Sequence, residues 1–156
     1  MNQLRRSFLK NAGTAGTVAA AIVAGLLKPG AVLAAAWNSL AFAAKDAAEA
    51  IKNAGYDGAA QSGDIIIKAP DIAENGAVVP VSATSNIPGT TSMVFFVEKN
   101  PTPMIASFEF SNGAEPYIAT RVKMAKTSVV RVSVKAGGKS YTNSREVKVT
   151  IGGCGG

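Results

Sequence analysis

Apolar and polar residues alternate along much of the second half of the chain. Val130, Val132 and Val134 fall on one side of an extended segment and the residues between them on the other. This period of two is typical of a strand with one buried face. Similar runs recur from residue 65 onward and predict seven strands, over residues 65–68, 78–83, 93–98, 105–110, 117–123, 128–135 and 146–151.

The segments between these runs are rich in glycine, proline and asparagine, which favour turns. They lie at residues 74–76, 86–89, 100–103, 111–113 and 136–139. About seven short strands with turns between them predict an all-β fold, an immunoglobulin-like β-sandwich. The Cys…Trp…Cys signature of antibody domains is missing, so the prediction concerns the architecture alone. Pro80 lies inside one run and predicts an edge strand or a bulge there.

Before the first predicted strand, residues 38–54 have the pattern of one amphipathic helix. Ser39 is a candidate N-cap, and Gly55 stands where a helix favours a left-handed residue. Half of the residues in the apolar stripe are alanines, whose small side chains predict close packing of the helix against another element. It consists of Leu40, Ala44, Ala47 and Ile51.

Residues 1–36 are typical of an export signal that is removed. Arg5 and Arg6 precede an uncharged apolar run over residues 11–27, which is too short and too rich in glycine and alanine for a membrane anchor. The pair indicates the twin-arginine route to the periplasm, with an ordinary secretory signal as the alternative. Cleavage after Ala36 is favoured over cleavage after Ala34. The predicted domains are the signal (1–36), a helix plus sandwich (37–151) and a C-terminal arm (152–156).

Charge and composition exclude several classes of function. All four basic residues of the predicted signal leave with it, so residues 37–156 retain 12 basic and 10 acidic residues, a net charge of +2. No basic run remains to bind nucleic acid. The chain contains no histidine, which removes the usual general base and zinc ligand. Its single cysteine excludes an internal disulfide, and a lone thiol in an exported protein calls for an explanation.

That cysteine stands in the last segment, Gly152-Gly153-Cys154-Gly155-Gly156. Glycines without side chains predict a flexible, thin arm, with Cys154 at most roughly 10 Å from Ile151. A free cysteine has a pKa of about 8.5, and this arm offers no cation or helix N-terminus to lower it. The pattern therefore indicates a covalent attachment point, with no catalytic residue. The alternative is a loose tail whose cysteine is accidental.

With these residues, the chain resembles the SoxY family, sulfur-carrier subunits of the periplasmic thiosulfate-oxidising Sox system. The resemblance rests on the twin-arginine start and on the Gly-Gly-Cys-Gly-Gly arm. It extends to interior segments at 72–76, 79–81, 100–103 and 120–123. Taken alone, Asn75-Gly76 and the segment at 100–103 are typical of turns, and Arg121 with Lys123 is typical of a solvated strand face.

The resemblance implies that Cys154 carries sulfur intermediates on a swinging arm formed by Gly152, Gly153, Gly155 and Gly156. It also implies a heterodimer with a SoxZ-like subunit. It further implies three partner enzymes. They are a cytochrome c complex that couples thiosulfate to the thiol, a metal-dependent hydrolase that releases sulfate, and a sulfane dehydrogenase. Haem and metal would belong to these partners, so the chain itself is expected to bind no cofactor or metal and to be no enzyme.

Other functions remain open on the residues alone. A ubiquitin-like carrier would use a terminal thiocarboxylate instead of Cys154, but its activation requires cytosolic nucleotide chemistry, which the export signal disfavours. A thiol oxidoreductase would need a resolving cysteine or a base, and the sequence supplies neither. An exported immunoglobulin-like interaction module would not need the thiol. A disulfide dimer through Cys154 is a further expectation, because an exposed thiol pairs readily with its twin.

Overall fold

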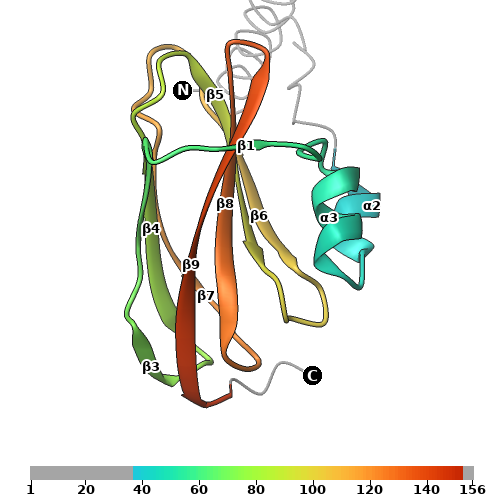
Figure 1. The fold of residues 1–156 in the computed structure, drawn as a ribbon, viewed down its shortest axis with the longest axis vertical. Coiled ribbons are helices and arrows are strands. Elements are labelled where there is room, and N and C mark those ends of the chain that lie inside the picture. The colour runs from blue at the N-terminus through green and yellow to red at the C-terminus, as the bar shows by residue number, and fades with distance from the viewer. Residues whose placement is uncertain (1–36, 153–156) are drawn as a thin grey trace, which may run out of the picture. The chain divides into compact units, whose positions relative to one another are not determined.

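The computed structural model describes residues 37–152. The predicted signal and residues 153–156 of the arm, Cys154 included, lie outside these described residues. Within them, no helix is long and apolar enough to cross a membrane. Two short helices, α2 (Ser39–Ala43) and α3 (Ala47–Asn53), precede the strands (Figure 1). The strands of this part of the chain are β1 (Ala60–Gln61), β2 (Ile65–Lys68), β3 (Ile72–Asn75), β4 (Val79–Ser85), β5 (Thr90–Val97), β6 (Met104–Glu109), β7 (Tyr117–Val122), β8 (Ser128–Ala136) and β9 (Lys139–Ile151).

The strands form two sheets that pack as a sandwich (Figure 1). The larger sheet has the order β1-β9-β8-β5-β6, and the smaller has the order β2-β4-β7. β9 organises the larger sheet: it pairs antiparallel with β8 on one side and parallel with both β1 and β3 on the other. The segment between the helices and β4 thereby covers an edge of β9 that would otherwise present unpaired backbone groups.

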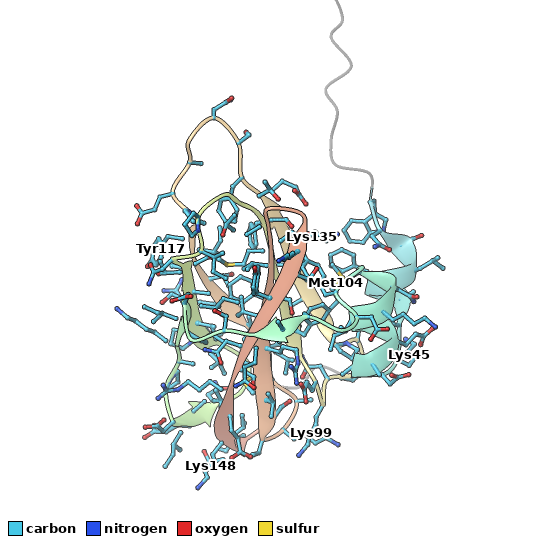
Figure 2. The ribbon with its side chains drawn as sticks, turned by 45° about the horizontal axis from the view of Figure 1, so that its top comes forward. Lys45, Lys99, Met104, Tyr117, Lys135 and Lys148 are labelled. Carbon is cyan, nitrogen blue, oxygen red and sulfur yellow. The ribbon has the colours of Figure 1, made fainter. Side chains whose placement is uncertain are left out.

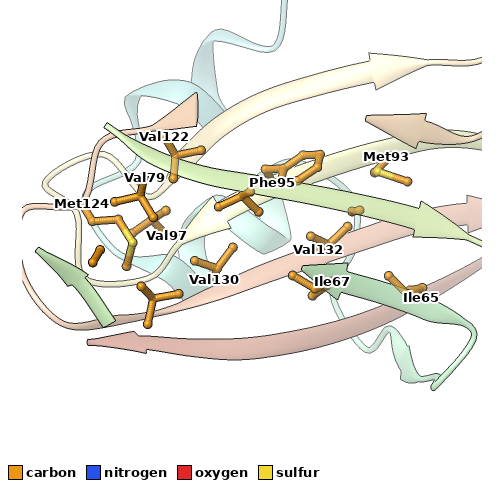
Figure 3. Close-up of a cluster of buried hydrophobic side chains, with 14 of the residues drawn as sticks. Ile65, Ile67, Val79, Met93, Phe95, Val97, Val122, Met124, Val130 and Val132 are labelled. Carbon is orange, nitrogen blue, oxygen red and sulfur yellow. The ribbon is translucent and has the colours of Figure 1, made fainter. Parts of the chain in front are cut away.

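The core lies between the sheets, as Figure 3 shows. Val130, Val132 and Val134 are fully buried, as their period of two predicts. The inward residues of β4 and β2 cover them from the opposite sheet. Phe95 is the largest side chain at the centre and meets the ring of Phe108 edge to face, with centroids 5.9 Å apart. The prediction of an all-β, immunoglobulin-like sandwich is confirmed.

All seven predicted strands are present, and two short ones were missed, β1 and β3. β9 is longer than predicted, since it begins at Lys139 instead of residue 146. Pro80 lies in β4, which is the central strand of its sheet, so the prediction of an edge strand is wrong for the strand as a whole. Yet β2 pairs with β4 only from Ser82 onward, and Pro80 therefore has a ladder partner only on the β7 side, at Arg121. The missing N–H is tolerated at this local edge.

The predicted N-terminal helical segment is present, but it forms two short helices instead of one helix over residues 38–54. The Asp46 side chain accepts a hydrogen bond from the Glu49 N–H at 2.9 Å and starts a second helix, so the chain turns between α2 and α3. Asn38, and not Ser39, caps the first helix. Gly55 follows α3 with φ +77°, as predicted.

The apolar stripe of the helices also differs from the prediction. Leu40 is 71% exposed. Ala44 and Ile51 of the predicted stripe do pack on the larger sheet, but the most buried contacts come from three alanines, which pack against Val94, Phe96 and Met104 on the outer face of β5 and β6. These alanines are Ala41, Ala44 and Ala50. The helix pair is thus a small layer on the larger sheet, while the outer face of the smaller sheet has no such cover in the described chain.

We predict that Phe95→Ala lowers the free energy of unfolding by about 3–5 kcal/mol, because it leaves a cavity at the centre of the sandwich. Denaturant unfolding of residues 37–156 measures this. The matched control is Ile66→Ala, which removes a side chain that is 43% exposed and should change stability by less than about 1 kcal/mol. Equal effects of the two changes would contradict the assignment of the core.

Candidate functional site

The candidate site is the end of the sandwich at which the chain leaves β9 toward Cys154. We call this region the exit end. It consists of residues 148–152 and three neighbouring segments, at 74–77, 98–103 and 123–127. Figure 1 shows the end of β9 beside β3 at this pole of the sandwich.

β9 changes partners as it approaches the exit. Its pairing with β8 stops at Val147, which faces Ser128, the first residue of β8. From Lys148 to Ile151 it pairs instead with β3, in parallel. On the β8 side, where the strand pairing has ended, the Thr127 hydroxyl accepts a hydrogen bond from the Val149 N–H at 2.9 Å. The last residues before the arm are therefore held on both sides.

Gly76 connects the exit to a second loop. Its N–H donates to the carbonyl of Ile151 at 2.8 Å, and its own carbonyl accepts from the Met124 N–H at 2.7 Å. Asn75 shapes this turn, because its side-chain oxygen accepts a hydrogen bond from the Ala77 N–H at 2.8 Å. A buried glycine is thus the link between the end of β9 and the segment at 123–127.

Asn100, on the connection between β5 and β6, also holds this loop. Its amide donates to the carbonyl of Lys123 at 2.7 Å, and its side-chain oxygen accepts from the Ala125 N–H at 3.0 Å. One side chain on the β5–β6 connection therefore satisfies two backbone groups of the loop between β7 and β8. The turn predicted at 100–103 is present, and it has a structural role beyond reversing the chain.

Gly152 is the one glycine of the predicted arm that the structure describes. It lies against Ala125, and a Cβ at this position would collide with the carbonyl oxygen of that residue. Glycine is therefore required here by close packing. The other predicted site residues lie outside the described residues: Gly153, Cys154, Gly155 and Gly156.

The interior segments of the resemblance gather in part at this end. Residues 72–76 form β3 and its turn, 100–103 supply Asn100, and the segment at 120–123 ends at Lys123, whose carbonyl Asn100 binds. Sequence reasoning treated these as separate turns or as a strand face. It missed their common position, because each contact joins residues 23 or more positions apart.

Residues 37–152 contain no cluster of three or more candidate metal ligands. Burial raises the pKa of Tyr56 above its usual value, and its hydrogen bond with Ser92 partly opposes this. That phenol joins the helical layer to β5 and lies under Lys135, whose ammonium is 5.0 Å from the ring centroid. Its role is structural.

A shallow groove crosses the outer face of the smaller sheet. Lys68, Pro80, Tyr117 and Arg121 line it. Its lining contains two cations, Lys68 and Arg121, and no acidic residue. Arg121 is exposed, as the prediction of a solvated strand face requires.

Comparison with known proteins gives two findings on solved structures. The chain is similar to the sulfur carrier protein SoxY from Chlorobium limicola f thiosulfatophilum, at 47% identity and a TM-score of 0.57, over 63% of this chain and 91% of that one. It is also similar to the superoxide reductase (neelaredoxin) from Ignicoccus hospitalis, at 20% identity and a TM-score of 0.47, over 55% and 78%. This second likeness is too weak to bear on function. No curated protein matches the chain.

The family comparison covers the exit end itself. The model of the family described as "Sulfur oxidation protein SoxY" matches residues 52–154, from the helical layer through every strand to the cysteine. This is more than half of the chain, and the solved relative at 47% identity has the same family name. The chain therefore belongs to the SoxY family of sulfur oxidation proteins.

Proposed function

We propose that this protein is a covalent carrier of sulfur intermediates, which it holds on the Cys154 thiol and presents to partner enzymes. The observation that carries the proposal is the place of the only cysteine. It is two residues beyond Gly152, which packs against the body of the sandwich, and the family match ends on it. The similar protein from Chlorobium limicola is itself a sulfur carrier.

Loading is an oxidative coupling. The Cys154 thiol loses its proton and forms a sulfur–sulfur bond with the terminal sulfur of thiosulfate. Two electrons leave in this step, and the c-type cytochromes of the partner complex accept them. The product is a thiosulfonate on the cysteine, with one negative charge.

Release of sulfate needs no further oxidation. Water attacks the sulfonate sulfur, the bond between that sulfur and the sulfane sulfur breaks, and the electron pair stays on the sulfane sulfur. Sulfate leaves, and a persulfide remains on Cys154. In this proposal a metal-dependent hydrolase activates the water for this step. The carrier is the substrate that its partner enzymes act on.

Covalent attachment explains why such a protein is useful. An intermediate on a tether meets each active site at a high effective concentration and is not lost between steps. Export through the twin-arginine route, already folded and paired with a SoxZ-like subunit, would bring the carrier to the periplasm together with its partners. A sulfane dehydrogenase that oxidises the persulfide would complete the set.

The first prediction concerns attachment. Protein isolated from cells that oxidise thiosulfate should contain mass increments of sulfur or sulfonate that a thiol reductant removes, and Cys154→Ser should abolish them. Intact-mass spectrometry measures this. The matched control is Cys154→Ser combined with Ser111→Cys, which moves the thiol to an exposed loop of the sandwich and should not be loaded. An unmodified thiol in the wild type would leave the interaction module as the better account.

The second prediction concerns the root of the arm. Gly152→Ala forces Ala125 or the end of β9 to move, which weakens the hydrogen bonds of Gly76 by about 1–2 kcal/mol. The amides of Gly76 and Met124 should then exchange with solvent about tenfold faster. Hydrogen exchange by NMR measures this. Gly63→Ala is the control, because a Cβ there meets nothing within 4 Å. Unchanged exchange in Gly152→Ala would contradict the packing at the exit.

A further inference from the structure

We propose that lysines around the exit end dock the carrier onto an acidic rim around the channel of a partner enzyme. This inference rests on the proposed carrier function. We call these lysines the lysine collar, and they are Lys99, Lys123, Lys126 and Lys148.

Each collar lysine is next to an anchored residue of the exit end. Lys148 faces Ile72 of β3, three residues before Ile151. Lys126 directly follows Ala125, against which Gly152 lies. The other two, Lys99 and Lys123, belong to the connections that the Asn100 side chain joins. Figure 2 shows Lys99 and Lys148 near one end of the sandwich, with Tyr117 and Lys135 toward the other.

The backbone under the collar is held in place. The Lys99 N–H donates to the Ser128 hydroxyl at 2.9 Å, and the Lys148 N–H donates to the carbonyl of Asp71 at 3.0 Å. The carbonyl of Lys123 accepts from Asn100. The charges therefore have defined attachment points around the exit, although their side chains reach into solvent.

Acidic groups at this end do not neutralise the collar. Glu98 is paired with Arg131, and Asp71 is paired with Arg145, each at 2.6 Å. No collar lysine forms a salt bridge within residues 37–152. The nearby acids outside these pairs are Glu74 and Glu146, so four cations stand against two anions.

The length of the arm brings the collar into any complex with an enzyme. Cys154 is two residues beyond Gly152, and two extended residues span at most about 7 Å. An active site that reaches the thiol must therefore approach the exit to within roughly the Debye length of about 8 Å at physiological ionic strength. At that distance a basic rim on the enzyme would repel the collar, and an acidic rim would speed association.

A docking surface fits the collar better than a binding site for a small anion. The lysines come from separate connections and one strand, and all are exposed. None of them lines the groove on the smaller sheet, and none lines the hollow between the β4–β5 connection and the loop at 110–116. An anion site would gather donors around one cavity, whereas these charges lie on several segments of the exit end.

The test measures how fast the purified cytochrome complex loads thiosulfate onto the mature carrier with its partner subunit bound. Lys123→Gln with Lys126→Gln should lower the second-order rate constant for the carrier about tenfold at low salt. The rate of the wild type should fall as salt increases, and that of the variant should fall less steeply. The matched control is Lys45→Gln with Lys139→Gln, two exposed lysines away from the exit, which should load at the wild-type rate.

The outcomes separate this inference from the proposed function. If the wild type is never loaded, the carrier function itself fails. If the wild type is loaded and the collar variant matches the control at every salt concentration, docking through the lysine collar is contradicted and the proposed carrier function is retained. If the variant raises the KM for thiosulfate and leaves the KM for the carrier unchanged, the lysines attract the anion and the docking proposal is overturned. Equal alkylation of Cys154 by a neutral reagent in all variants ensures that the arm itself is unaffected.

Discussion

The transfer of β9 from β8 to β3 is the interaction that holds the exit end together, and the proposed function depends on it. β8 ends its pairing at Ser128, and β9 continues for four residues beyond Val147. The partners of these four residues come from β3, from its flanking residues Asp71 and Gly76, and from the Thr127 hydroxyl, which replace the ladder with β8. The same pairing covers the edge of β9, which would otherwise be open to association with a second chain.

A short tether is useful only if its root is fixed. Flexible residues allow a thiol to enter an active site, but every flexible residue added to the root enlarges the volume that the thiol samples and lowers its effective concentration. Here the restriction extends to Gly152, where glycine is needed for packing against Ala125. Glycine therefore has two roles in this motif. At Gly152 it allows close packing, whereas at the later glycines the sequence predicts conformational freedom.

The sequence predicts the sandwich well because its signal is local. The alternating valines of β8 indicate their own burial, and the turns between strands are rich in residues that favour turns. The missed parts depend on distant partners. β3 is a four-residue segment whose pairing with β9 joins residues 76 positions apart, and nothing in its composition indicates a strand. The break before α3 was missed because the segment is rich in alanine, although Asp46 followed by Glu49 is a capping pattern.

The candidate site was also predictable only in part. The cysteine and its glycines are recognisable from the local sequence, whereas the roles of Asn100 and Gly76 arise only when the loops meet.

A carrier that serves several enzymes in turn must bind each of them quickly and leave each of them quickly. A large apolar interface would slow release, because affinity differences among complexes reside mostly in the dissociation rate. Exposed charges act differently: they raise the association rate, and because water and salt screen them, they add little to the lifetime of the complex. Lysines on anchored loops around a short arm meet both requirements. Under the proposed function, the specificity for the cargo can then reside in the channels of the enzymes, and the carrier would contribute the thiol and the lysine collar that aligns it.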